Sequence, residues 1–383
     1  MSAPLVTVAL PVYNAQEFLT PAVESLLGQT MGDLELVITD NASTDATEDM
    51  VRAWMREDDR IRYDRAPVNR GLAWNWNRAV PMARGRYFKW AAADDMHLPG
   101  YLEATVGLLE EDPTAVLAHC RTMDVDENGQ FLGLVPNGLA MDAATPHERF
   151  HALTHKGWPC VQIFGLMRLD VLRMTGLHGA YPRSDRALLA EMGLHGRLVE
   201  VPEVLFHRRE YSGRTTRATD LRTRYPVFTG GPVPPAPMPH WDLLEGFLAG
   251  LRRAPLPAAE RARCLAALSD YTQVSTRGLL RELQRRTFHV AGLSGRSTPK
   301  APAVALAAAP APAVVAAPVA AAPVAVVPAP APASPVSAPV AAVPQATAPA
   351  IKVPGHAPAG LGGPATAGAG VLTPSRSETA GAA

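Results

Sequence analysis

The sequence predicts an α/β fold: a mostly parallel sheet flanked by helices, a helical C-terminal extension and a Pro/Ala-rich tail. Three observations carry this prediction. β-rich runs alternate with helical runs through the first 112 residues, which is typical of a parallel sheet covered on both faces. Residues 241–288 contain long helical runs instead. From residue 301 the chain is almost wholly Ala, Pro, Val and Gly, and its recurrent prolines exclude a membrane helix.

The first 112 residues contain four predicted strand–helix pairs. The helix expected at 15–30 has Phe18, Leu19, Val23, Leu26 and Leu27 at helical spacing. The strands are expected within 5–14, 34–47, 60–71 and 85–95, and the helices within 15–30, 48–57, 71–84 and 100–112.

The pattern changes after residue 112. Residues 115–135 predict two strands around an Asp-Glu-Asn-Gly turn. An apolar run at 161–176 ends in a helix that closes at Gly176, and 183–212 predicts a capped helix followed by one or two strands. Helices are expected at 241–253 and 258–288, with prolines between them.

Composition excludes several classes of function. Lys+Arg and Asp+Glu both number 36, so a general electrostatic footprint for nucleic acid is not expected. Three distant cysteines have no metal-ligand spacing, which favours a reducing, cytoplasmic location. The N-terminal run lacks a basic segment and is broken by Pro11, so we expect a first strand there and no signal peptide.

Polar side chains follow each of the first four predicted strands. They are Tyr13 and Asn14, Asp40 and Asn41, Asn69 and Arg70, and Asp94 and Asp95. Right-handed crossovers place the carboxyl ends of parallel strands on one edge, where ligands bind. No Gly-x-Gly-x-x-Gly and no phosphate loop are found. Side chains and a metal would therefore have to hold any nucleotide phosphates.

These clusters, in this order, resemble glycosyltransferase family 2, the inverting sugar transferases of GT-A fold. The resemblance rests on "TVALPVYNAQEFLTPAVESLLGQT", "DLELVITDNASTDAT" and "NRGLAWNWNRAVPMARGRYFKW". It covers roughly residues 6–99 and continues more loosely to about residue 212.

The resemblance implies a nucleotide site at the first three strand ends. Pro11, Tyr13 and Asp40 would flank the nucleobase, with Tyr13 stacking on it and Asp40 accepting a hydrogen bond. Arg70 would lie near the base or the diphosphate. The alternative for Tyr13 is simple packing in the core.

The resemblance also implies a metal motif. Asp94 and Asp95 would occupy the Asp-x-Asp position, with Asp95 as the direct ligand of Mg²⁺ or Mn²⁺. Ala92 stands where many members have a further carboxylate, so the donor diphosphate would supply much of the coordination. The alternative is a solvated acidic turn. Because like charges repel, we expect removal of Asp95 not to destabilise the protein.

An inverting transfer needs one base, and in the family an Asp or Glu heads a helix after the sheet. Asp185 fits that position, and Glu191 is the alternate. The competing interpretation is that Asp185 only caps the helix.

Other side chains have both a functional and a structural interpretation. His207 and Arg209 could clamp the diphosphate or lie at a solvated strand end. The tryptophans Trp74, Trp76, Trp90 and Trp158 could stack on sugars or fill the core. Basic helices around Arg252, Arg261 and Arg281 could contact a membrane surface or solvent.

The sequence thus predicts a glycosyltransferase domain at 1–215, with a nucleotide-binding half at 1–112 and an acceptor-binding half at 113–215. A helical extension follows at 216–295 and a disordered tail at 296–383. The expected donor is a UDP- or dTDP-sugar, and the acceptor a glycan, a lipid-linked or a small molecule. A nucleotidyltransferase and an inactive binding module are the alternatives.

Overall fold

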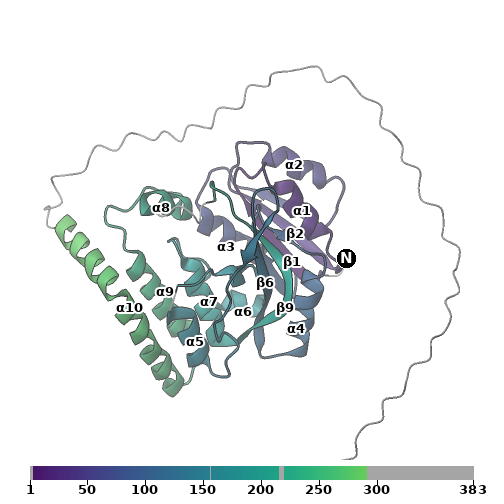
Figure 1. The fold of residues 1–383 in the computed structure, drawn as a ribbon. Coiled ribbons are helices and arrows are strands. Elements are labelled where there is room, and N and C mark those ends of the chain that lie inside the picture. Colours follow the sequence, from purple (N-terminus) through teal and green to yellow (C-terminus); the bar gives the residue numbers. More distant parts are fainter. Residues whose placement is uncertain (1–2, 156, 215–219, 291–383) are drawn as a thin grey trace, which may run out of the picture. The chain divides into compact units, whose positions relative to one another are not determined.

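The computed structural model describes residues 3–155, 157–214 and 220–290. Within them, nine strands form one sheet in the order β3-β2-β1-β4-β8-β6-β9-β5, with β7 paired to β6 (Figure 1). Helices cover both faces of this sheet, which confirms the predicted α/β class. The predicted tail at 296–383 lies outside the described residues.

The first half of the sheet is parallel, as predicted. It contains β1 (Val6–Val12), β2 (Leu34–Asp40), β3 (Ile61–Arg65) and β4 (Tyr87–Trp90), connected by α1 (Leu19–Leu27), α2 (Thr47–Trp54) and α3 (Leu72–Met82). Every residue of β1 and β2 is buried, because these strands lie inside the sheet with helices on both sides. Their carboxyl ends therefore meet at one edge.

The second half of the sheet is mixed. Its strands are β5 (Met96–His97), β6 (Ala115–Val125), β7 (Phe131–Leu134), β8 (Leu166–Arg168) and β9 (Arg197–Arg209). Its helices are α4 (Tyr101–Glu111), α5 (Pro146–His155), a 3₁₀ turn (Val161–Phe164), α6 (Leu169–Met174) and α7 (Ser184–His195). β8 is antiparallel to β4 and β6, and the β6–β7 hairpin is found where predicted. The sequence did not predict β5 or α5.

Two hydrophobic cores lie on the two faces of the sheet. Leu10 of β1 packs with Leu26 of α1 and Leu102 of α4 in one core. Trp90 of β4 packs with α3, α6 and α7 in the other. Figure 1 shows the same division, with α1, α2 and α4 on one side and α3, α6 and α7 on the other. The sheet edge between these layers is left for the polar strand ends.

The sheet is followed by α8 (Leu221–Thr229), α9 (Pro239–Arg253) and α10 (Ala258–Val290). Residues of α9 and α10 belong to the second core. The ring of Phe247 in α9 contacts Phe150 of α5 and Tyr271 of α10, with centroids 6.2 Å and 5.3 Å apart. The hydrophobic core thus continues past the predicted domain boundary at residue 215. Among the described residues, no helix combines the length and apolar character needed to cross a membrane.

Candidate active site

The loops after β1 and β2 are joined by hydrogen bonds between backbone and side chains. The Asn14 N–H donates to Ser43 Oγ at 2.9 Å, and the Thr44 N–H donates to Asn14 Oδ1 at 2.8 Å. The loop after β3 joins the same edge, because Asn41 Nδ2 donates to Asn69 Oδ1 at 2.8 Å. The first three polar clusters thus form one rim, as the topology predicted.

Asp40 holds the shape of this rim. Its carboxylate is fully buried and accepts hydrogen bonds from the N–H and Oγ of Ser43 at 2.8 and 2.7 Å. Its second oxygen accepts from the Tyr63 hydroxyl at 2.6 Å and lies 3.4 Å from Arg65 Nε. These partners occupy its acceptor positions. Its contact with a nucleobase stays a prediction. To accept a hydrogen bond from the base, Asp40 would have to give up one of these four contacts.

Tyr13 and Arg70 are exposed on the rim. Tyr13 is 44% exposed, so the alternative that it packs in the core is wrong and its ring is free for stacking. Pro11 lies within β1 and is buried. The Arg70 guanidinium lies over the Trp74 ring, 4.3 Å from its centroid. That contact holds a positive charge beside the loop without burying it.

Asp95 is a buried carboxylate in the short connection between β4 and β5, because the fourth strand ends at Trp90 and not at residue 95 as predicted. Its Oδ1 accepts a hydrogen bond from the Arg209 N–H at 2.9 Å, and its two oxygens each lie 3.4 Å from Arg214. Burial raises the pKa of Asp95 to about 7, with Asp94 adding to the effect and Arg214 opposing it. For Asp95 the interpretation as a solvated turn is therefore wrong.

The partner of Asp95 bears on the expected stability of an Asp95 variant. We expected that removing one charge of a repelling pair would not destabilise the protein, but Arg214 is itself only 8% exposed. Its other carboxylate within ion-pair distance, among the described residues, is Glu210 at 3.7 Å. Loss of Asp95 weakens the pairing of a buried guanidinium, a cost that opposes the gain from removing a buried charge whose pKa is raised.

The donor set fits a divalent cation. Asp94 and Asp95 offer carboxylate oxygens, the ligands that Mg²⁺ and Mn²⁺ prefer. The guanidinium of Arg214 lies 3.4 Å from Asp95, so a positively charged group is already accommodated beside this carboxylate. Ala92 offers no oxygen from its side chain, so Asp95 with Asp94 would hold the ion.

Arg209 and His207 have structural contacts. The Arg209 guanidinium donates to the carbonyls of Asp94 and Glu127 at 3.0 and 2.6 Å, which fixes the acidic loop against the β6–β7 turn. The His207 ring packs edge-on against Phe131, with centroids 5.5 Å apart. Trp90 is fully buried and Trp76 packs against it, so these two tryptophans belong to the core.

Asp185 lies in the first turn of α7. The cap position is Arg183, with φ 73°, so Asp185 lies two residues inside the cap, and its structural role of satisfying a helix-start amide stays open beside the catalytic one. Its carboxylate accepts a hydrogen bond from the Arg186 N–H at 2.9 Å. Burial raises the pKa of Asp185, while Arg186 and Arg224 oppose that rise. A carboxylate with a raised pKa is a better proton acceptor than a solvated one.

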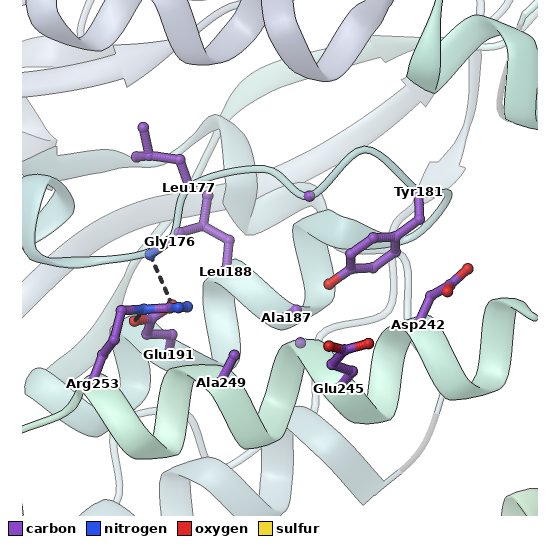
Figure 2. A pocket seen from close by; sticks show the side chains of 12 residues that line it. Gly176, Leu177, Tyr181, Ala187, Leu188, Glu191, Asp242, Glu245, Ala249 and Arg253 are labelled. Atoms are coloured by element: carbon purple, nitrogen blue, oxygen red, sulfur yellow. Dashed lines mark hydrogen bonds and ion pairs between the residues drawn. The ribbon is translucent and has the colours of Figure 1, made fainter. Parts of the chain in front are cut away.

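Glu191 is held in a structural ion pair. It is 3% exposed, accepts two hydrogen bonds of 2.8 Å from Arg253 and accepts one from the Gly176 N–H at 3.1 Å (Figure 2). It lies at the wall of a pocket between α7, α9 and the loop before α7. The side chains lining that pocket include Leu177, Tyr181, Leu188, Asp242, Glu245 and Ala249. Asp185 does not line this pocket, and the contacts of Glu191 argue against its use as a base.

The chain after β9 connects the separate parts of the site. Arg214 pairs with Asp95, and the positive charge of Arg224 in α8 lowers the pKa of Asp185. The end of α8 packs on the Arg70 loop so closely that a Cβ on Gly71 would lie 2.3 Å from the nitrogen of Gly230. Sequence reasoning missed both arginines. The available signal was the arginine-rich run "SGRTTRATDLRTR" after the last strand.

Comparison with known proteins agrees with this architecture. The profile of Glycosyl transferase family 2 matches residues 7–172. An uncharacterised glycosyltransferase of Methanocaldococcus jannaschii is 33% identical over 134 residues, which are 34% of this chain and 46% of that protein. Chondroitin synthase of Escherichia coli is 30% identical over 169 residues, 42% of this chain and 24% of that protein. The chain thus spans less than half the length of these relatives.

A solved structure shares the fold. Residues 1–349 of S. aureus TarS in complex with UDP-GlcNAc superpose with a TM-score of 0.53 at 16% identity, covering 71% of this chain and 74% of that one. The sheet, its flanking helices and the acidic strand end therefore define a GT-A fold. Residues 7–172 form a domain of glycosyltransferase family 2.

Proposed function

We propose that the protein is an inverting glycosyltransferase that transfers a sugar from a nucleotide-diphosphate sugar to an acceptor hydroxyl. One observation carries the proposal. After β9, Arg214 pairs with Asp95, and Arg224 lowers the pKa of Asp185. Further along, Gly230 packs against the Arg70 loop. Residues assigned separately to the nucleotide, the metal and the base are thereby linked through Arg214, Arg224 and Gly230.

The nucleotide would bind at the rim formed by the first three strand ends. The exposed Tyr13 ring would stack on the base, with Pro11 beneath it and the Asp40 loop beside it. Arg70 would approach the base or the diphosphate, since its guanidinium is exposed and held by Trp74. UDP and dTDP remain the favoured nucleotides, and the TarS neighbour is described with UDP-GlcNAc.

Asp95, with Asp94, would hold Mg²⁺ or Mn²⁺. When bound, the cation would neutralise the charge that develops on the diphosphate as the glycosyl bond breaks. Asp95 must be ionised to serve as a ligand, and Arg214 favours its ionised form.

Asp185 would take the proton of the acceptor hydroxyl. The acceptor oxygen then attacks the anomeric carbon, the bond from that carbon to the diphosphate oxygen breaks, and the nucleoside diphosphate leaves. Attack from the opposite face inverts the anomeric centre. A positioned base contributes roughly 10²–10⁴-fold to such a step.

A panel of sugar nucleotides tests the proposal without knowledge of the acceptor. Thermal unfolding is measured with each compound, with and without Mn²⁺ or Mg²⁺. We expect a divalent-dependent rise for at least one diphosphate sugar and a smaller rise for its nucleoside monophosphate. A ligand at about 100 times its dissociation constant adds roughly 2.7 kcal/mol. No rise with any sugar nucleotide would contradict the proposal and favour an inactive binding module.

The nucleotidyltransferase alternative makes a different product. Such an enzyme would release pyrophosphate from a nucleoside triphosphate and a sugar phosphate, whereas the proposed enzyme releases a nucleoside diphosphate. The first loop after β1, "PVYNAQEFL", lacks the Gly-rich basic sequence that a nucleotidyltransferase would use. Analysis of the released nucleotide separates the two.

A further inference from the structure

Two histidines and one aspartate meet between α5 and α10, remote in sequence from the residues assigned to catalysis. His151 and His155 are on α5, and Asp270 is on α10. One ligand atom from each of the three lies within 4.8 Å of the others. His151 Nε2 is 2.8 Å from Asp270 Oδ2, and the two imidazole rings are stacked with centroids 4.8 Å apart.

The spacing of the two histidines is typical of metal binding. Residues four apart on a helix lie one above the other on the same face, and a His pair at this spacing can bind zinc. A carboxylate from another element completes a three-ligand set of the His₂–carboxylate type, which leaves one position for water. Imidazole and carboxylate together favour zinc over magnesium or calcium.

An ordinary ion pair does not account for the whole cluster. His151 and Asp270 alone would satisfy each other, as His147 and Glu260 do one turn earlier between the same helices at 2.8 Å. His155 has no function in such a pair, and its Nδ1 is buried without a hydrogen-bond partner. As the third ligand of a metal ion, His155 would have a function that the ion pair does not give it.

The geometry needs only side-chain adjustment. Ligands on a tetrahedral zinc ion lie about 3.4 Å apart, given metal–ligand distances of about 2.1 Å. The side chains of His151 and Asp270 are 41% and 43% exposed, so their rotation can close the remaining gap.

We infer that His151, His155 and Asp270 form a Zn²⁺ site that cross-links α5 to α10. The two helices are joined there across 119 residues of sequence. The site is independent of the proposed transfer reaction, because none of its ligands belongs to the residues that bind donor or take the acceptor's proton. Its function is to hold the C-terminal helix on the catalytic domain.

Zinc content and cobalt absorption test the inference on the untagged full chain. The protein is stripped with a chelator, incubated with Zn²⁺ and dialysed, and the metal per chain is measured by atomic emission. A second sample receives Co²⁺, whose absorption reports tetrahedral coordination. We expect one zinc per chain, a tetrahedral cobalt spectrum and a melting temperature that rises with zinc.

Matched variants assign the site. His155→Ala and Asp270→Asn should lose the bound zinc, the cobalt spectrum and the zinc-dependent rise in melting temperature. His147→Ala removes a histidine of the same helix that pairs with the same partner helix, and it should keep all three. Asp95→Ala should also keep them, which separates this site from the catalytic one. Asp270→Asn preserves the side-chain shape, so it covers the case in which His155→Ala fails to fold.

Two results would overturn the inference. The first is a wild-type chain that retains no zinc after dialysis. The second is zinc retention in His155→Ala and Asp270→Asn equal to that of the wild type.

Discussion

The sequence left two carboxylates as candidates for the base, and the structure allows an experiment that separates them. Asp185→Asn and Glu191→Gln are matched changes, since each replaces a carboxylate by an amide of the same shape. We expect Glu191→Gln to lower stability and spare turnover. We expect Asp185→Asn to keep stability and lower turnover.

The size of the stability effect follows from the contacts of Glu191. Its carboxylate accepts two hydrogen bonds from Arg253 and one from Gly176. A glutamine keeps one acceptor oxygen but presents an NH₂ group to the guanidinium, so one charge-assisted bond is lost. Such a bond is worth roughly 1.5–3 kcal/mol, which is discounted here because Arg253 is partly exposed. A loss of about 1 kcal/mol after this discount lowers the melting temperature by about 2–4 °C.

Asp185→Asn should cost no stability. Burial raises the pKa of Asp185, so the folded state disfavours its ionised form relative to the unfolded chain, and at neutral pH an amide removes that cost. Its oxygen can still accept the hydrogen bond from Arg186. An amide does not accept a proton at neutral pH, so turnover should fall by about two to four orders of magnitude.

Two measurements suffice for both variants. Thermal unfolding gives stability, and release of nucleoside diphosphate from the sugar nucleotide gives turnover, by hydrolysis where the acceptor is unknown. A Glu191→Gln protein of wild-type stability that had lost turnover would refute the reasoning. So would an Asp185→Asn protein that turned over within a fewfold of wild type.

Three further predictions concern metal, pH and the tail. Asp95→Ala should abolish divalent-dependent binding of the nucleoside diphosphate, measured by calorimetry. It should also lower the melting temperature modestly, because Arg214 loses its partner. Unchanged divalent dependence would exclude Asp95 as a ligand. Turnover should rise with pH through a midpoint above the ordinary carboxyl range, because burial raises the pKa values of Asp185 and Asp95 and both carboxylates must be ionised for transfer. A midpoint in the usual range would argue against both assignments. A chain ending at Gly295 should keep the melting temperature and nucleotide binding of the full chain, and a large drop in either would show that the tail packs on the domain.

The rim was predictable because its signals are local. Each of the first four strands is a short apolar run ended by polar residues, and the crossover rule places those ends on one edge. The polarity of Asp40 and Asp95 was visible in the sequence, and so was the position of Asp185 at the head of a helix. None of these required knowledge of a distant partner.

The missed features depend on contacts between distant residues. Arg214 lies 119 residues from Asp95 in the sequence, so no local pattern pairs them. The sequence likewise shows the repelling Asp94 beside Asp95 and hides the arginine that partly compensates it. β5 is only two residues long and exists because it pairs with the end of β9. The contacts of Glu191 likewise depend on α9.

The shared core of α5, α7, α9 and α10 has a consequence for how the chain folds during synthesis. The helix that carries Asp185 buries one face against α9, and α5 buries one against α10. Both partners leave the ribosome after the whole sheet has been made. Contacts of such long sequence separation form slowly and leave apolar surface exposed in intermediates. Chains ended before α9 should therefore remain protease-sensitive at α5 and α7 while the parallel half of the sheet is protected. Equal protection of both halves would show that the base-bearing helix matures without its C-terminal cover.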